Sequence, residues 1–506
     1  MKKKCYIVVA ALLLIAGTAS AQVVSLKSGA WNSDTTWVGG TVPTAGSNVV
    51  IDTGMTVSLN IATAECNNLT VNGTLAFIDA AGLGLTVHGD MTIGVKGAFN
   101  TAQTNTVTAA RNCRVELFKN LTVTAGGKFD MRRGSGALVG VGRVIFTGTA
   151  NSVINLSQTV YASTIEEFNT VVINKSGGAK VILASGNLFQ NNNTTNSADT
   201  LLFISGMIET GNNFWVNLST SGAAVTGASS TSYVNGILGR GLSNSNPATR
   251  KLEVGDSTGY RPVTVQTTVS GVATGHHVWA KIVKGDANTG SSTLNGGIDK
   301  VSKVRYAQVG YVSGAGAASM SFCRFSPSYG TDDGVTAGNQ ELRVAYSTNN
   351  RATWLAIGPT TDTTSLTNPP TTIRSDSLTT AYVIPGGQSI YVAIARATGT
   401  TKNSLESGGT AVRDENNAPV SFGLSQNYPN PFNPSTSIQY RIGTSGNVTL
   451  NVYDLLGKQV ASVVDEHQEA GEYTVQFNAG DLSSGMYFYT LRSGNAVEYK
   501  KMMLLK

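Results

Sequence analysis

A short strand motif, Leu-Thr-Val followed by a turn, recurs in the first half of the chain and sets its fold class. Residues 69–73 read LTVNG, residues 85–89 read LTVHG, and residues 121–123 read LTV again. Each copy alternates apolar and polar side chains, as a strand with one buried face does. A period of about 16–18 residues suits one coil of a β-solenoid, whose apolar face is buried only by stacking on the next coil. We therefore predict a solenoid over residues 22–244, with later coils beginning near 171–173 and 181–183.

Composition supports an all-β chain and excludes several classes of protein. Charged residues make up 13% of the 506 residues, about half the usual share, and 57 residues are glycine. This composition argues against a helical bundle, a coiled coil or a Rossmann-type enzyme. The net charge of +6 includes three lysines of the leader, Lys2 to Lys4. The remaining positive charge is scattered, so no nucleic-acid partner is expected.

The N-terminal 21 residues have the pattern of a secretory signal peptide. A basic stretch at 2–4 precedes an apolar stretch at 6–16, and Ala19-Ser20-Ala21 is a cleavage site of the A-x-A type. The apolar stretch is too short to span a membrane, and no later stretch reaches 18 apolar residues. We expect export by the Sec machinery and no integral membrane segment in the mature chain.

The rest of the chain divides into three further parts. Strand-like runs at 261–265, 277–283, 341–347 and 390–395 are separated by turn residues, which predicts a β-sandwich over 245–400. The polar stretch 401–418 is predicted to be a linker. Alternating strands with glycine turns over 419–506 predict a small Ig-like β-sandwich with its own core.

The last part resembles the type A C-terminal sorting domain of the type IX secretion system. The resemblance rests on five segments: NYPNPFNPST (427–436), VYDLLG (452–457), AGEY (470–473), LSSGMYF (482–488) and KKMMLLK (500–506). It implies handling by the type IX translocon, passage through the periplasm and outer membrane, and an extracellular or outer-surface location. The residues that we assign to the sorting signal are Pro429, Asn430, Pro431, Phe432, Asn433, Pro434, Ser435, Tyr453, Asp454, Gly457, Gly471, Tyr473, Gly485, Tyr487, Lys501 and Lys506.

The start of the mature chain is similar to parallel β-helix surface proteins of Bacteroidetes-like bacteria. Residues 28–31 (SGAW), 36–37 (TW), 42–43 (VP) and 48–51 (NVVI) carry this likeness. It implies a right-handed parallel β-helix, distantly similar to eight-glycine domains, and a surface location. No reaction is attached to it.

Candidate chemistry in the sequence is sparse, and no catalytic residue is assigned. Ser257 lies in a G-x-S-x-G match, but no helix signal follows, so we predict a turn between two strands. Asp332, Asp333 and Glu341 are candidate calcium ligands on a turn and its neighbouring strand. No other metal or cofactor is expected.

Two tryptophans and three cysteines leave alternatives open. Trp31 and Trp37 either stack on a glycan or pack against the first coil, since an exposed solenoid end needs a cover. Cys66, Cys113 and Cys323 remain after cleavage, and we expect buried, inert thiols, with a Cys66–Cys113 disulfide as the alternative.

These observations favour a non-catalytic secreted or cell-surface protein with an adhesion, matrix or glycan-contact role. The alternative is a polysaccharide-degrading enzyme, a lyase or glycoside hydrolase, with its site on the solenoid. Carboxylates or cations clustered in one groove favour the enzyme. A flat face of Thr, Ser and Asn favours the binding protein.

Overall fold

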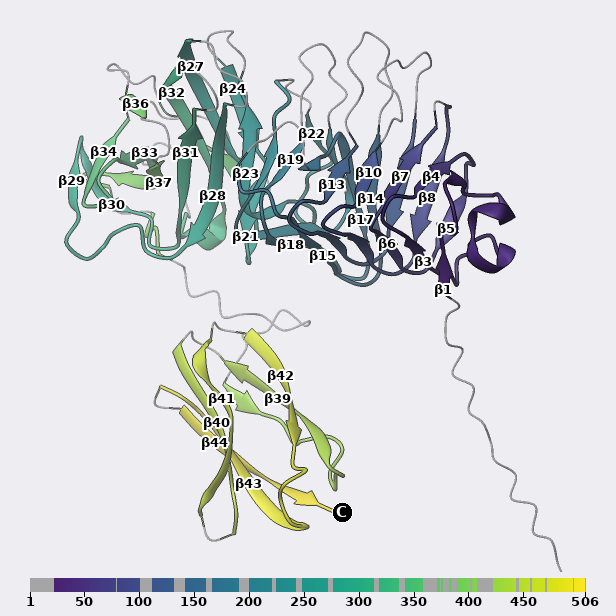
Figure 1. Cartoon of the computed structure of the whole chain (residues 1–506). Helices are drawn as coiled ribbons and strands as arrows, with labels where there is room; N and C mark the ends of the chain where they lie inside the picture. Colours follow the sequence, from purple (N-terminus) through teal and green to yellow (C-terminus); the bar gives the residue numbers. More distant parts are fainter. Residues whose placement is uncertain are drawn as a thin grey trace, which may run out of the picture. The chain divides into compact units, whose positions relative to one another are not determined.

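A computed structural model of the chain contains two compact units, Met1–Glu406 and Ser407–Lys506 (Figure 1). We call them the N-terminal and the C-terminal unit and describe each by itself. The structure describes residues 22–78, 80–100, 112–131, 142–160, 166–190, 200–220, 224–242, 248–271, 276–313, 318–335, 342–357, 371–373, 375, 382–384, 389–400, 403–406, 422–442, 446–455, 457–468, 471–494 and 496–505.

The first part of the N-terminal unit is a parallel β-solenoid, as predicted, and it has about 7 turns. Its short strands stack into three parallel sheets, here called sheets 1, 2 and 3 (Figure 1). Sheet 1 contains β1 (Gln22–Val24), β3 (Asn48–Ile51), β6 (Leu69–Val71), β9 (Met91–Ile93), β12 (Leu121–Val123), β15 (Ser152–Asn155), β18 (Lys180–Ser185), β19 (Leu188–Gln190), β21 (Met207–Asn217), β23 (Val234–Gly241) and β25 (Val254–Asp256). Sheet 2 contains β2 (Gly29–Ala30), β4 (Thr56–Leu59), β7 (Thr74–Phe77), β10 (Ala98–Asn100), β13 (Lys128–Asp130) and β16 (Glu166–Glu167). Sheet 3 contains β5 (Ala64–Cys66), β8 (Gly84–Val87), β11 (Arg114–Leu117), β14 (Arg143–Gly148), β17 (Thr170–Lys175), β20 (Leu201–Ser205) and β22 (Val225–Thr226).

The coils are longer than the 16–18 residues expected from the repeated motif. Leu69 pairs with Met91 and Met91 with Leu121, so successive coils advance from 69 to 91 and then to 121, by 22 and 30 residues. The copy that begins at Leu85 lies in β8 of sheet 3, on another face of the same coil. The prediction was wrong because a three-sided coil contains several strands with the same alternation, and spacing alone does not tell their faces apart.

Alternate residues of each strand point into the solenoid and form its core. In β3 and β4 the buried positions are Val49, Ile51, Val57 and Leu59. Phenylalanine rings contact one another from coil to coil behind sheet 2, the first pair edge to face and the next two stacked: the ring centroids of Phe77, Phe99, Phe129 and Phe168 are successively 5.8, 5.3 and 5.0 Å apart. Such ring pairs stabilise stacked coils beyond the area that they bury.

Side-chain hydrogen bonds join the turns that precede the strands of sheet 1. The side-chain amide of Asn68 donates to Oδ1 of Asn48 at 2.8 Å, and that of Asn120 donates to Oδ1 of Asp90 at 2.9 Å. Oδ1 of Asn68 accepts from the backbone N–H of Asp90 at 2.7 Å. Gly73 lies in the following turn, where a Cβ atom would come within 2.2 Å of the carbonyl oxygen of Asp52. These turns therefore fix the path of successive coils.

Cys66 and Cys113 are buried and form no disulfide, which agrees with the expectation of buried thiols. Cys66 ends β5 and pairs with Val87 of β8, whereas Cys113 precedes β11, on the other side of β8. Strands two steps apart are separated by roughly 10 Å, beyond the range of a disulfide. The alternative of a Cys66–Cys113 disulfide was therefore wrong. The side chain of Cys323 lies outside the described part.

Sheet 1 continues without interruption into antiparallel strands. β23 pairs in parallel with β21 on one side and antiparallel with β28 on the other, so β28 covers the edge that the solenoid would otherwise expose. The added strands are β26 (Gly259–Tyr260), β28 (His277–Lys284), β29 (Thr293–Asn295), β30 (Ile298–Val301), β31 (Arg305–Val312), β33 (Leu342–Ser347), β34 (Thr353–Ala356) and β37 (Ser389–Ala397). A separate antiparallel sheet contains β24 (Ala248–Leu252), β27 (Val263–Gly271), β32 (Ala318–Tyr329), β35 (Thr371–Thr372) and β36 (Tyr382–Ile384).

These antiparallel sheets share one continuous hydrophobic core with the solenoid. The strands predicted at 277–283, 341–347 and 390–395 correspond to β28, β33 and β37. Residues 403–406, at the start of the expected linker, pack on this unit instead: Leu405 is buried, and Glu406 pairs with Lys300 at 2.7 Å. Most of the expected linker lies outside the described residues.

The C-terminal unit is an antiparallel β-sandwich with its own core, as predicted. Val448, Leu450 and Val452, predicted to share a face, are all fully buried. One sheet contains β38 (Gly423–Leu424), β39 (Ser435–Ile442) and β42 (Gly471–Asn478). The other has the order β41 (Gln459–Gln468), β40 (Gly446–Tyr453), β43 (Gly485–Ser493) and β44 (Ala496–Leu504).

Helical structure in the described residues consists of three short 3-10 turns: η1 (Asp34–Thr36), η2 (Val38–Gly40) and η3 (Thr331–Asp333). None of the described helices has the length and hydropathy to cross a membrane.

Candidate functional site

The proline-rich segment of the C-terminal unit is held against the last strand of the chain. The hydroxyl of Tyr489, in the neighbouring strand β43, accepts from the backbone N–H of Asn427 at 2.8 Å. Asn427 is buried and donates from its side-chain amide to the carbonyl oxygen of Pro429 at 3.1 Å. Oδ1 of Asn430 accepts from the N–H of Met503 at 2.9 Å. The segment is thus a structural element of the sandwich.

The other predicted sorting residues lie in turns and strands of the same unit. Gly457 has φ of 81° in the turn after β40, where its N–H donates to the carbonyl oxygen of Asp454 at 3.1 Å. The hydroxyl of Tyr487 donates to Ser483 at 2.8 Å, and the ring of Tyr473 stacks on Tyr440 at 5.4 Å. The remaining positions are Tyr453 at the end of β40, Gly471 at the start of β42, Gly485 at the start of β43, Lys501 in β44, and Lys506, which lies outside the described residues.

Comparison with known families agrees with both resemblances. Residues 426–505 match the family model of the secretion system C-terminal sorting domain, and residues 36–157 match that of the G8 domain. No curated protein and no solved structure matches the chain. The chain carries a type IX C-terminal sorting domain, which directs export to the cell surface or the extracellular space.

Trp31 and Trp37 do not present a face to a sugar. Their side chains are 0% and 1% exposed, and their rings meet edge to face at 5.3 Å. The indole N–H of Trp37 donates to the carbonyl oxygen of Trp31 at 2.8 Å. The glycan-contact candidate is therefore corrected: turn η1 lies between the two residues, and both rings pack in the first coil.

Asp332 and Asp333 face arginines. Arg261 binds both carboxylate oxygens of Asp332 at 2.6 Å, and Arg305 pairs with Asp332 and, at 2.8 Å, with Asp333. Burial would raise the pKa of Asp332, but the two guanidinium groups outweigh it and lower the pKa. Burial raises the pKa of Asp333 to about 6, although Arg305 opposes this.

The calcium prediction stays a prediction, and this geometry does not add to it. Glu341, the third candidate ligand, lies outside the described residues. Among the described residues, no group of three or more His, Cys, Asp or Glu side chains is placed to hold a metal ion.

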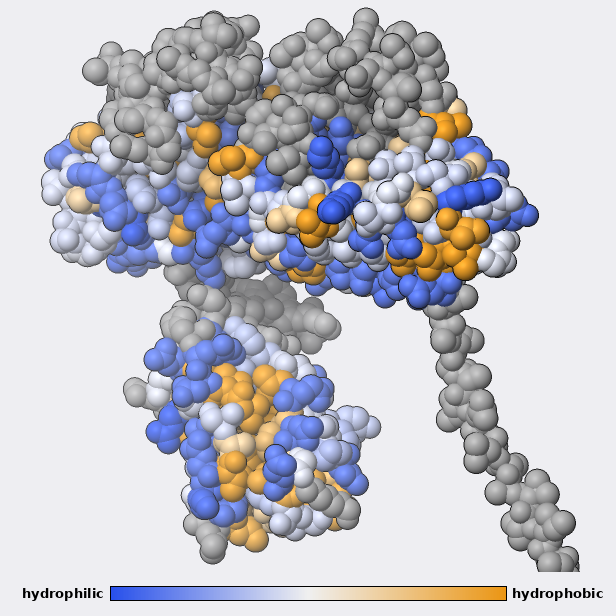
Figure 2. All heavy atoms as spheres, viewed as in Figure 1, coloured by the Kyte–Doolittle hydropathy of each residue, from blue (hydrophilic) through white to orange (hydrophobic). Residues whose placement is uncertain are grey.

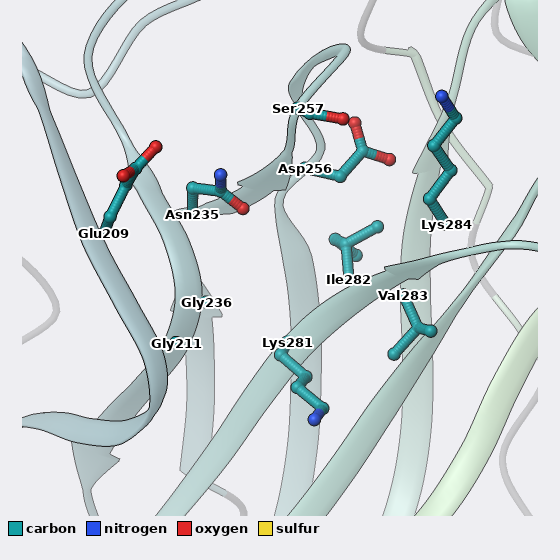
Figure 3. A pocket seen from close by; sticks show the side chains of 10 residues that line it. All are labelled: Glu209, Gly211, Asn235, Gly236, Asp256, Ser257, Lys281, Ile282, Val283 and Lys284. Atoms are coloured by element: carbon teal, nitrogen blue, oxygen red, sulfur yellow. The ribbon is translucent and has the colours of Figure 1, made fainter. Parts of the chain in front are cut away.

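A pocket of about 520 Å³ lies where the solenoid meets the antiparallel strands (Figure 3). It is lined by Glu209, Gly211, Asn235, Gly236, Asp256, Ser257, Lys281, Ile282, Val283 and Lys284. Sequence reasoning did not find it, because its residues come from β21, β23, the β25–β26 turn and β28, which meet only in the folded chain.

Two carboxylates line the pocket, and each already has a cationic partner. Glu209 pairs with Lys180 at 2.5 Å. Asp256 pairs with Arg305 at 3.5 Å and accepts from the N–H of Thr258 at 2.8 Å. Figure 3 shows the Lys281 ammonium group directed away from both carboxylates.

Ser257 lies in the turn of a hairpin between β25 and β26, as predicted, because Asp256 pairs with Gly259. The pocket lining contains no histidine that would activate its hydroxyl.

A polar ladder runs across the outer surface of sheet 1. Thr70 pairs with Thr92, Thr92 with Thr122, Thr122 with Asn155, and Asn155 with Ser185. The flanking residues of these strands, such as Leu69, Val71, Met91 and Ile93, are buried, so the ladder residues face outward. Stacked strands are about 4.8 Å apart, so the five side chains span roughly 19 Å.

Proposed function

We propose that the N-terminal unit is a non-catalytic binding module that contacts a repetitive glycan or matrix polymer after export. The observation that supports this most is the polar ladder: five hydroxyl or amide side chains on five adjacent strands, paired in register from Thr70 to Asn155 and across a β-bulge from Asn155 to Ser185. A row of donors and acceptors that repeats from strand to strand suits a polymer whose hydroxyl groups also repeat. This is the kind of face that the sequence analysis associated with the binding protein.

A bulky, charged side chain substituted into the ladder tests whether the ladder binds the polymer. Thr92→Lys should lower co-sedimentation of the chain with the polysaccharide that it binds, tested over a panel of acidic and neutral polymers. The matched control is Thr86→Lys, which lies six residues earlier on the outer surface of sheet 3, between Glu65 and Glu116. Equal binding by the two variants would contradict a role for sheet 1.

The enzyme alternative is supported by one observation, the junction pocket. A glycoside hydrolase needs one carboxyl group as a proton donor and a second as base or nucleophile. Glu209 and Asp256 are both engaged by cations, which leaves neither as an available proton donor in this structure. If the pocket is catalytic, Asp256→Asn should abolish depolymerisation of a substrate polymer, whereas Thr92→Lys should lower its binding only.

A further inference from the structure

The C-terminal unit exposes hydrophobic residues at its surface (Figure 2), and one set of them belongs to a single sheet face. In β43, Tyr487, Tyr489 and Leu491 point into the core. Strand alternation therefore turns Met486, Phe488 and Arg492 outward. In β44, Met502 and Leu504 are buried, and the alternate residues Val497, Tyr499, Lys501 and Met503 are exposed and point outward.

The register of the strands places these outward residues side by side. Met486 pairs with Met503, Phe488 with Lys501 and with Tyr453 of β40, and Arg492 with Val497. Tyr499 is 74% exposed and Met503 37% exposed. We call the set Tyr453, Met486, Phe488, Val497, Tyr499 and Met503 the outer sheet face. An exposed apolar face of this kind on a soluble domain marks an interaction site.

The face is suited to recognition by side chains, because the nearby edge of β44 is already occupied. The backbone carbonyl of Met503 accepts from Phe432 at 2.9 Å, and the N–H of Leu505 donates to Phe432 at 3.0 Å. The carbonyl oxygen of Lys501 accepts from the side chain of Gln426 at 2.7 Å. A partner strand therefore cannot pair with this part of β44.

The charges on the face indicate the chemistry of its partner. The outward positions of β40, β43 and β44 carry two cations, Lys501 and Arg492, whereas a carboxylate on the same side of the sheet, that of Asp465, lies on β41 at the opposite edge from β44. A complementary surface is apolar and bears carboxylates that meet these cations.

We propose that the outer sheet face is the surface by which the sorting domain docks on a component of the export machinery, an apolar protein surface bearing carboxylates. The proposal rests on the sorting role of this domain and adds the face that performs it.

The test uses the full chain in a bacterium with a working type IX system. Tyr499→Ser with Met503→Ser should lower the amount of chain at the surface and in the medium by about tenfold or more, as loss of interface hot spots does. Lys501→Glu should lower it too, because it places like charges opposite each other. Matched controls are Val95→Ser with Ile204→Ser, at solenoid positions 64% and 61% exposed, and Lys458→Glu in the turn after β40. These controls should be exported as the unmodified chain is.

Unchanged export of both face variants would overturn the proposal, as would equal loss in the controls. A second outcome would also overturn the proposal: export is unchanged, the purified chain is a dimer, and Tyr499→Ser with Met503→Ser abolishes that dimer. The face would then bind a second copy of the chain. Deletion of residues 420–506 tests the sorting role separately: trapping of that deletion, with normal export of the face variants, refutes the docking face alone. Lys501 is exposed, so the Lys501→Glu variant should fold. It keeps the test valid if the double variant does not fold.

Discussion

The backbone N–H of Phe432 donates a hydrogen bond to the carbonyl oxygen of Met503 at 2.9 Å, and the N–H of Leu505 donates one to the carbonyl oxygen of Phe432 at 3.0 Å. Two segments that the sequence places at opposite ends of the sorting domain are therefore one structural element. The Phe432 ring is buried in the core of the same unit. The proline-rich motif thus closes the sandwich over its last strand.

Phe432→Ala should destabilise the C-terminal unit by about 3–5 kcal/mol, the usual cost of removing a buried phenylalanine ring. Denaturant unfolding of the purified full chain, followed by proteolysis of the C-terminal unit, measures the change. The control is Tyr428→Ala, whose side chain is 81% exposed and should contribute little. Equal stability of the two variants would show that the motif does not hold the sandwich together.

Arg305→Ala should destabilise the N-terminal unit by about 3 kcal/mol or more, since it leaves buried Asp256 and Asp333 without their shared cation. The comparison is Lys300→Ala, which breaks the pair with the solvent-exposed carboxylate of Glu406 and should destabilise the unit much less. Thermal unfolding of both variants at neutral pH is the measurement. A smaller loss for Arg305→Ala than for Lys300→Ala would contradict the geometry.

Because of Lys175, the free energy of unfolding of the solenoid should change with pH in the alkaline range. Burial lowers the pKa of its ammonium group from 10.5 to about 8, and this group donates to the carbonyl oxygens of Phe118 and Thr147. Between pH 8 and 10.5 the unfolded chain holds more protons at this position, so the free energy of unfolding should rise with pH.

Unfolding curves at several pH values, compared between variants, isolate this contribution. Lys175→Met should remove the rise, whereas Lys128→Met, at an exposed position of β13, should keep it. The same pH dependence in the unmodified chain and in both variants would contradict the assignment to Lys175.

Cys66 and Cys113 should resist thiol reagents in the native protein and react only after unfolding. Burial, and to a lesser degree the charge of Glu65, raises the pKa of the Cys66 thiol to about 12, so almost no reactive thiolate forms at neutral pH. Mass spectrometry after alkylation, with and without guanidinium, counts the modified residues. A native disulfide between the two, or rapid alkylation of either, would be inconsistent with their places on either side of β8.

Local patterns predicted the fold class and the sorting domain well. Val448, Leu450 and Val452 alternate as a strand with one buried face must, and the glycine at 457 adopts the positive φ of a turn. These signals depend on neighbouring residues in the sequence. For the same reason, the hairpin at Ser257 could be predicted from its turn residues.

Features that depend on distant residues could not be predicted. Leu69 and Leu85 each begin a Leu-Thr-Val motif, yet they lie in different sheets of one coil, which no spacing argument separates. The arginine partners of Asp332 come from positions 261 and 305, and the polar ladder becomes visible only when the register of sheet 1 is known. The burial of Trp31 likewise follows from packing around η1.

The central claim, binding without catalysis, is tested most directly by the chain length of polysaccharides. Residues 22–418 are incubated with a panel of acidic and neutral polymers, with and without calcium, and the products are sized. We predict that at least one polymer binds and that every polymer keeps its length. Shortened chains would contradict this account and assign the junction pocket, with Glu209 and Asp256, to an enzyme.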